Sequence, residues 1–327
     1  MGFLDKLKKK KKAYAVFEGG GVKGLGIAGA LEVAERYYEW ENVAGTSAGA
    51  IIGALVAAGY SASEIKDMLF SINYKQLKDP FPAGKIPPVG GPIYNVITRM
   101  GIYQGKFIED WVKEKLAARG IRSFGDLINS KERDDRYKYK LQVITSDISR
   151  GRMVVLPRDL KFYGINPDEF SVARAVRMSS TIPFYFAPVV IKYHDERCVL
   201  RESYFVDGGV LSNFPLWLFE SEGARPKLPT FGFRLVGPNE GRPRNIEGPV
   251  SFLAALVSTM LEAHDAYYLE ERSSAKTISI PTLGIHATDF DISKEMMRQL
   301  YESGKMAAEA FFEHWNFGFY LQRFFSK

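Results

Sequence analysis

Apolar residues near the start of the chain form two kinds of pattern that alternate with each other. Residues 13–17 and 42–44 are short runs of the kind that form buried strands, whereas residues 25–38 and 48–58 have the length and apolar content of helices. Glycines follow each predicted strand and precede each predicted helix, as in tight strand-to-helix turns. Alternation of strand and helix predicts a mostly parallel sheet that is covered by helices.

The same patterns continue along the rest of the chain. Ser61, with Glu64 three residues later, has the form of a capping box and predicts another helix start. Residues 79–105 are rich in proline and glycine, which predicts a long irregular segment of the type that forms lids and binding loops. Further strands are predicted at residues 139–145, 153–156, 189–193, 203–206, 230–235 and 277–280, and further helices at residues 106–118, 170–178, 250–269 and 293–315.

No internal repeat or flexible linker divides the chain, so we expect one α/β domain with three layers, α/β/α, around a mostly parallel sheet. Its expected parts are a basic tail at residues 1–12, a domain at residues 13–290, and a C-terminal helix with an aromatic-rich tail at residues 291–327. The aromatic rings of this last segment either pack on the domain or a second subunit, or enter a membrane interface. They are Phe311, Phe312, Trp315, Phe317, Phe319, Tyr320, Phe324 and Phe325.

The positive charge of the chain is concentrated in its first residues. The formal net charge is +6, from 44 basic and 38 acidic residues. Six lysines in the tail account for all of it, namely Lys6, Lys8, Lys9, Lys10, Lys11 and Lys12. The rest of the chain is neutral on balance, which argues against a nucleic-acid-binding surface. The tail is compatible with a solvated, disordered start or with peripheral contact with an anionic membrane, at about 1 kcal/mol per lysine.

Targeting signals are not visible in the sequence. No apolar run after the lysines is long enough for a signal peptide, and none approaches the roughly 18 residues of a membrane-spanning helix. The single Cys198 excludes an internal disulfide and fits a reducing compartment. The sequence therefore predicts a cytoplasmic protein that is either free or peripheral at the membrane.

Gly45, Thr46, Ser47, Ala48 and Gly49 fit the pattern of a nucleophile elbow, in which a serine occupies a sharp turn between a strand and a helix. Glycines two positions before and after the serine permit the strained backbone and the close packing of such a turn. The hydroxyl then projects at a helix N-terminus, where the positive end of the helix dipole stabilises developing negative charge. The pattern alone is also compatible with a structural glycine turn.

A second glycine-rich stretch, at residues 18–24, comes between the first predicted strand and helix. It lacks the spacing of a phosphate-binding Walker loop and of a dinucleotide-binding fingerprint. Its unobstructed backbone amides suit an oxyanion hole, at about 3 kcal/mol per donor. The candidate residues are Gly19, Gly20, Gly21, Val22, Lys23 and Gly24. The Lys23 ammonium either reinforces the positive field or lies in solvent.

Asp207, Gly208 and Gly209 follow the strand predicted at residues 203–206. A carboxylate at this point lies at a strand's C-terminal end, where open α/β sheets place their ligands. In a dry cleft its basicity rises, and direct contact lets it accept a serine proton. Alone, these three residues would more often be an ordinary turn.

The three stretches together resemble the patatin-like phospholipases, which have a glycine-rich oxyanion loop, then a GxSxG serine and then a DG[GA] aspartate. A fourth family-like block runs from Ser179 to Phe184 and on to Pro188, and Asn213 to Pro215 follow the aspartate as expected. The similarity extends over about residues 13–290. Glu18 stands where many relatives carry aspartate, and Lys23 where many carry arginine.

This resemblance implies a lipid acyl hydrolase with a dyad of Ser47 and Asp207, and an oxyanion hole of amides around Gly20, Gly21 and Val22. Ser47 would attack an ester carbonyl, and Asp207 would move the proton and later activate water. The implied substrate is a phospholipid or lysophospholipid, with a neutral glyceride as the second choice. No cofactor is implied.

Two rival interpretations remain open on the sequence. An ordinary α/β-hydrolase would need a histidine base from His264, His286 or His314, but only one predicted strand and one helix precede the strand that leads to Ser47, where that fold has several strands. A catalytically silent lipid- or partner-binding module is the other. Asp147, Asp289 and Asp291 lie in predicted loops without metal-site spacing, so no metal requirement is expected.

Overall fold

The computed structural model describes residues 10–82, 91–130, 134–220, 225–238, 246, 255–256, 259–260 and 271–326, with residues 91–93 as backbone only. Its helices and strands are β1 Lys11–Phe17, α1 Gly24–Ala34, β2 Tyr38–Thr46, α2 Ala48–Ala57, α3 Ala62–Ser71, α4 Gly91–Arg99, β3 Gly101–Tyr103, α5 Lys106–Ala117, β4 Leu141–Asp147, β5 Arg152–Leu156, α6 Val172–Ser179, β6 Phe184–Phe186, β7 Val189–His194, β8 Leu200–Asp207, β9 Thr230–Val236, α8 Glu271–Ser274, β10 Thr277–Pro281, α9 Lys294–His314 and α10 Phe317–Phe325.

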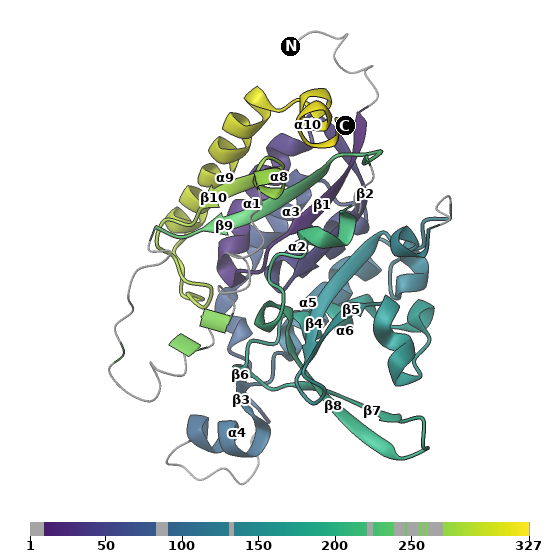
Figure 1. The fold of residues 1–327 in the computed structure, drawn as a ribbon. Helices are drawn as coiled ribbons and strands as arrows, with labels where there is room; N and C mark the ends of the chain where they lie inside the picture. Colours follow the sequence, from purple (N-terminus) through teal and green to yellow (C-terminus); the bar gives the residue numbers. More distant parts are fainter. Residues whose placement is uncertain are drawn as a thin grey trace.

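The main sheet has the strand order β10-β9-β1-β2-β4-β8-β7, with β5 paired to β4 (Figure 1). From β10 to β4 every neighbouring pair is parallel, whereas β8, β7 and β5 join in antiparallel pairs. Helices flank the sheet, because parallel strands are joined by crossover connections that usually contain a helix. The prediction of an α/β fold with a mostly parallel central sheet is confirmed.

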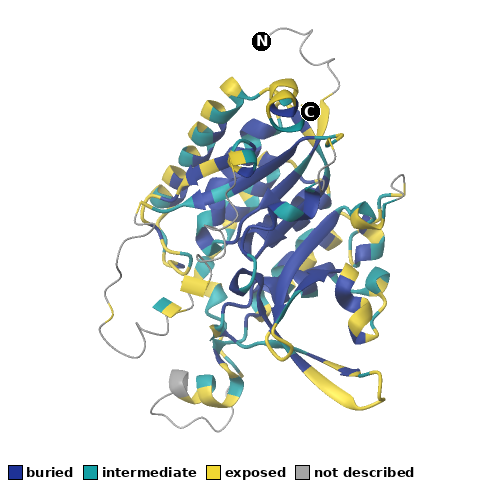
Figure 2. Cartoon of the chain, viewed as in Figure 1, coloured by how far each residue is buried: buried dark blue, intermediate teal, exposed yellow. Residues whose placement is uncertain are grey.

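The strands at the centre of the sheet are buried on both faces, as Figure 2 shows for the dark-blue centre of the molecule, whereas the outer ends of β7 and β8 are exposed. The larger core lies between one face of the sheet and helices α1, α2, α5, α6 and α9. On the opposite face, Val16, Ala44 and Ile144 pack with the short 3-10 helix at Leu216–Phe219. Because adjacent strand residues point to opposite faces, the same short runs supply both cores.

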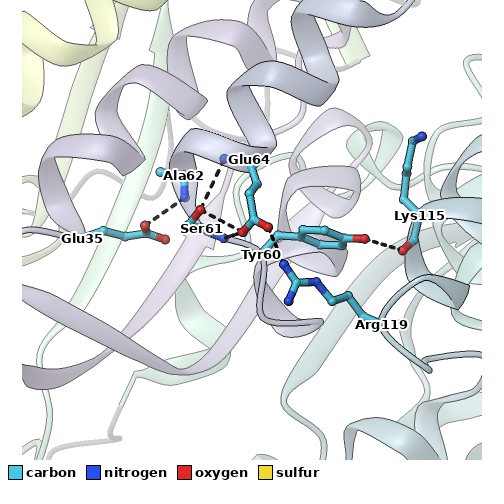
Figure 3. Close-up of polar contacts among 7 residues, drawn as sticks. All are labelled: Glu35, Tyr60, Ser61, Ala62, Glu64, Lys115 and Arg119. Atoms are coloured by element: carbon cyan, nitrogen blue, oxygen red, sulfur yellow. Dashed lines mark hydrogen bonds and ion pairs between the residues drawn. The ribbon is translucent and has the colours of Figure 1, made fainter.

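A polar network ties α3 to its neighbours (Figure 3). Ser61 and Glu64 form the predicted capping box, since the Ser61 backbone N–H donates to Glu64 and the Glu64 N–H donates to the Ser61 hydroxyl. Glu64 also pairs with Arg119, just beyond α5, at 2.5 Å. The Tyr60 hydroxyl donates to the Lys115 carbonyl at 2.7 Å. These contacts fix α3 and α5 relative to each other.

Several predicted boundaries were wrong. The helix predicted at residues 25–38 ends at Ala34, because Tyr38 begins β2, where its ring packs on Phe231 at 4.7 Å. Lys11 and Lys12, assigned to the tail, are the first residues of β1 and pair with β2. The Lys12 ammonium lies 2.5 Å from Glu41. Strand pairing therefore prevails over local charge and apolar spacing.

Residues 79–105 are not irregular throughout, because they contain α4 and β3. β3 pairs with β6, a strand that the sequence did not predict, through Gly101 with Phe184 and Tyr103 with Phe186. At the base of the segment, Asp79 accepts hydrogen bonds from the backbone of Gly105 and of Phe107. The helix predicted at residues 250–269 lies for the most part outside the described residues, as do residues 1–9 of the tail.

The C-terminal helix α9 packs along α1, and its aromatic residues cover one end of the sheet. The rings of Phe312 and Trp315 lie 5.3 and 5.1 Å from that of Phe231. Trp315 donates to the Tyr38 hydroxyl at 3.1 Å. The residues after it form α10, on which Phe319 is exposed while Tyr320 is buried. No helix within the described part of the chain is long and apolar enough to cross a membrane.

Candidate active site

Ser47 occupies a sharp turn between β2 and α2. Its backbone has φ 54° and ψ −121°, a conformation that side chains rarely adopt and that stores strain. A Cβ on Gly45 would overlap the Gly49 carbonyl oxygen, and one on Gly49 would overlap the carbonyl of Phe17. Thr46 also anchors the turn, since its hydroxyl donates to the Ser212 carbonyl at 3.0 Å. The predicted elbow is therefore a strand-turn-helix in which only glycine fits two positions before and two positions after the serine.

Asp207 is the last residue of β8. Its backbone N–H donates to the Thr181 carbonyl at 2.7 Å, and its Oδ1 accepts from the Gly209 N–H at 2.9 Å. Gly208 and Gly209 form the tight 3-10 turn that follows. Asp207 is thus held through its backbone N–H and through one of its carboxylate oxygens.

Strand β4 brings Ser47 and Asp207 together. Thr46 pairs with Ile144 of β4, and Asp207 pairs with the next residue, Thr145. Because β5 occupies one edge of β4 along residues 143–147, β2 and β8 share the other edge and meet on it from opposite directions. The two candidate residues therefore stand at the point where these strands end.

Burial raises the pKa of the Asp207 carboxyl to about 7, and a hydrogen bond from Ser47 and that from Gly209 oppose the rise. Asp207 Oδ2 is buried and makes no hydrogen bond of regular geometry with the described residues. The Ser47 hydroxyl is thus close enough to lower the carboxyl pKa but is not locked to Oδ2. A carboxylate with a pKa near neutrality is suited to act as a general base.

The glycine-rich loop beside Ser47 offers fewer amides than the sequence predicted. Four of its six N–H groups already donate: Gly19 to Asn213 O, Val22 to Ala287 O, Lys23 to Gly20 O, and Gly24 to Gly21 and Val22 O. Gly20 and Gly21 make no such donation to any described residue. Of the two, Gly21 has φ +56° and lines the pocket that contains Ser47. The amides of Gly20 and Gly21 are therefore the two in this loop that are not engaged by a described residue.

Glu18 and Asn213 hold this loop in place. Glu18 is buried and accepts from the Leu235 N–H and, at 3.4 Å, from the Asn213 side chain. The Asn213 side chain also donates to Gly19 O, and the Asn213 backbone carbonyl accepts from the Gly19 N–H. Lys23 is half-buried, with its stem alongside Gly20. Sequence motifs pointed to Asn213 as a family feature but did not indicate this role.

An almost entirely apolar pocket opens beside Ser47, with a volume of about 700 Å³ including the part open to solvent. Its walls come from the glycine loop, α2, α3, α5 and the block after α6. The lining includes Leu69, Ile72, Phe107, Trp111, Phe186 and Phe290, together with Ser47 and Ala48. Helices α3 and α5, which the network in Figure 3 fixes, thus supply two of its walls. Its apolar lining suits a hydrocarbon chain.

The end of α6 and the residues just after it support both candidate residues, which sequence reasoning did not foresee. The Ser179 hydroxyl accepts from the Ser47 N–H at 2.9 Å, and the Thr181 carbonyl accepts from Asp207. Thr181 is held in turn by the buried Arg177, which also donates to the carbonyls of Gln104 and Ala187. Burial lowers the pKa of Arg177 to about 10.

The rival candidates lie elsewhere. His286 and His314 are exposed and do not line the pocket, and His264 lies outside the described residues. Asp147 accepts hydrogen bonds from Tyr163 and two backbone amides, and Asp291 pairs with Lys78. Among the described residues, no group of three acidic, histidine or cysteine side chains could hold a metal ion.

Comparison with known proteins bears on this site. The family model described as "Patatin-like phospholipase" matches residues 15–219, which include Ser47 and Asp207. The chain is 41% identical over 308 residues to the uncharacterized protein YqhO of Bacillus subtilis, covering 92% of this chain and 98% of that protein. It is 27% identical to a cGAMP-activated phospholipase of Vibrio cholerae, covering 61% of this chain and 54% of that one.

Among solved structures, VipD from Legionella pneumophila has the same fold. It superposes with a TM-score of 0.53 at 17% identity, over 92% of this chain and 66% of its own. At this identity the likeness concerns the fold alone.

Proposed function

The chain belongs to the patatin-like phospholipase family, and from this premise we propose that it hydrolyses lipid acyl esters through a dyad of Ser47 and Asp207. One observation carries the proposal. A strained serine lines an almost entirely apolar pocket, and a buried carboxyl with a pKa raised to about 7 lies close enough to hydrogen-bond to it. A turn with a purely structural role would not require this combination.

In the first half of the reaction, Ser47 Oγ attacks the ester carbonyl carbon while Asp207 Oδ2 accepts the hydroxyl proton. The carbonyl oxygen becomes an oxyanion, which the Gly20 and Gly21 amides stabilise at about 3 kcal/mol each. The tetrahedral intermediate collapses to the acyl-enzyme when Asp207 returns the proton to the departing alcohol. The acyl chain stays in the apolar pocket.

In the second half, Asp207 takes a proton from water, and the resulting hydroxide attacks the acyl carbonyl carbon. Collapse of this second intermediate releases the fatty acid and returns the proton to Ser47. The strained backbone of Ser47 and its bond to Ser179 keep the hydroxyl in place through both halves. No histidine is required, because burial already brings the carboxyl pKa close to the working pH.

The substrate class follows from the pocket lining. No lysine or arginine lines the pocket among the described residues, so a phosphate head group would remain outside it. A phospholipid or lysophospholipid is the first candidate, in keeping with the family and with the Vibrio cholerae relative. A neutral glyceride fits the same uncharged lining and is the second.

The test compares the wild type with Ser47→Ala and Asp207→Ala on phospholipid vesicles and on diacylglycerol emulsions, with released lipids identified by mass spectrometry. Ser203→Ala is a matched control, since Ser203 is a buried serine whose hydroxyl has no partner among the described residues and does not line the pocket. We expect release by the wild type and Ser203→Ala only. Full activity of Asp207→Ala would favour a histidine base, and vesicle binding without release by the wild type would indicate a silent lipid-binding module.

A further inference from the structure

An exposed apolar surface surrounds the paired strands β3 and β6. It consists of Tyr94 and Ile97 on α4, Met100 between α4 and β3, and Phe184 at the start of β6, and we call it the α4–β6 patch. Their side chains are 36%, 76%, 45% and 41% exposed. Pairing of Gly101 with Phe184 brings the two ends of the patch together. In Figures 1 and 2 this region projects from the body of the molecule.

Two members of the patch have an unfavourable backbone conformation. Met100 has φ 58° and Phe184 has φ 63°, in the left-handed region where glycine and asparagine are favoured. Such conformations cost about 1–3 kcal/mol for other residues. At each of these two positions, a large apolar side chain is held on a strained backbone and is also partly exposed to water. Strained backbone together with a partly exposed apolar side chain at both positions points to a role in binding.

The patch is continuous with the pocket. Tyr103 pairs with Phe186, which lines the pocket. The Tyr185 ring lies 5.0 Å from that of Tyr103, 4.9 Å from that of Phe186 and 5.5 Å from that of Phe290, another lining residue. A single aromatic layer thus has the patch on one side and the acyl pocket on the other.

The near absence of charge in the patch indicates what kind of partner it binds. Arg99 is the one charged residue between positions 91 and 104, and none occurs between positions 178 and 191. A tyrosine beside aliphatic side chains on a short amphipathic helix, as on α4, is typical of a membrane interface. The two segments that form the patch carry no acidic residue, which limits repulsion by lipid phosphates; the Asp291 carboxylate, close to Tyr185, is paired with Lys78.

We infer that the α4–β6 patch docks on the surface of a lipid bilayer and delivers acyl chains from it to the pocket. This inference rests on the proposed function for its substrate, but docking itself does not require catalysis. Arg99 adds a single cation, so binding through the patch is mostly hydrophobic and resists salt. Binding through the N-terminal lysines would instead be lost at high ionic strength.

The test uses the full chain with the substitutions Ile97→Gln, Met100→Asn and Phe184→Asn together. Asparagine suits the left-handed conformation, so this patch variant should melt at the wild-type temperature or above. The matched control is Cys198→Asn with Met306→Gln, since Cys198 is exposed with φ 58° and Met306 is 67% exposed on α9, outside the patch. Vesicle binding is measured in a Ser47→Ala background, so that hydrolysis does not alter the membrane.

With vesicles of three parts phosphatidylcholine to one part phosphatidylglycerol in 0.5 M salt, we expect the patch variant to bind at least tenfold more weakly than the control. When the same substitutions are made in the chain with Ser47 intact, both variants should cleave a water-soluble short-chain ester at a rate within twofold of the wild type. Equal vesicle binding by the two variants would overturn the inference, as would a concentration-dependent dimer that only the patch variant abolishes. Absence of ester cleavage by the wild type would refute the proposed function but leave the binding comparison valid.

Discussion

Replacing Asp207 by asparagine is expected to abolish hydrolysis and, at the same time, to stabilise the fold at alkaline pH. Asparagine Oδ1 can keep the hydrogen bond from Gly209, and Nδ2 can take the place of Oδ2, which has no regular partner among the described residues. The substitution therefore removes a buried charge and leaves the packing intact. Stability gained on loss of activity would identify the carboxylate as a group kept for function.

The magnitude follows from the pKa of Asp207, which burial raises from 3.8 to about 7. Between these values the folded protein holds a proton that the unfolded chain has lost, so the wild type loses stability as pH rises through this window. At 1.36 kcal/mol for each pH unit, the full loss is about 4 kcal/mol above pH 7. The asparagine variant does not lose it.

The assay is urea unfolding of the wild type and Asp207→Asn at pH 5 and at pH 8, because taking the difference between the proteins cancels the titration of shared groups. The variant should gain about 1.5 kcal/mol at pH 5 and about 4 kcal/mol at pH 8. In parallel, kcat/KM of the wild type should rise with pH to half its maximum near pH 7. A stability difference that stays constant between the two pH values within about 0.5 kcal/mol would refute this account of Asp207.

Three further outcomes are expected. Gly49→Ala should lower the free energy of unfolding by about 3 kcal/mol, because its Cβ would overlap the Phe17 carbonyl; an unchanged melting temperature would contradict this. Arg177→Met, which releases Thr181 and leaves buried carbonyls unpaired, should lower kcat and shift the midpoint of the pH profile; Arg177→Lys should recover part of both, and a change in stability alone would speak against a positioning role. Chelation by EDTA should leave hydrolysis unchanged, and recovery of a lost activity on adding calcium would contradict the absence of a metal requirement.

The sequence predicted those parts of the fold in which local pattern and tertiary contact agree. The apolar runs before Glu18 and Ser47 became β1 and β2, and the capping box at Ser61 became the start of α3. Glycines around Ser47 were informative because their requirement is local, within one turn. The serine's position and backbone strain were therefore predictable from five consecutive residues.

Other features depend on residues distant in the chain. β3 and β6 are three residues long and exist through their pairing with each other, so neither has a pattern of its own. Proline and glycine around α4 hid a helix whose apolar residues face solvent. The sequence also could not show which loop amides are available, because the Ala287 carbonyl, which accepts from the Val22 N–H, follows a different strand. Sequence motifs indicate which groups a loop offers, but not which of them the fold has already used.

The meeting of Ser47 and Asp207 shows how register becomes chemistry. A slip of β8 by one residue along β4 would move Asp207 by about 3.3 Å and turn its side chain to the other face of the sheet. Two side chains of β4 oppose this slip, since the Thr145 hydroxyl donates to the Val206 carbonyl at 2.9 Å and the Ser146 hydroxyl to the Gly208 carbonyl at 3.4 Å. β5 holds the other edge of β4 over the same residues. The distance between serine and carboxylate is therefore set by a strand that contributes no reacting group.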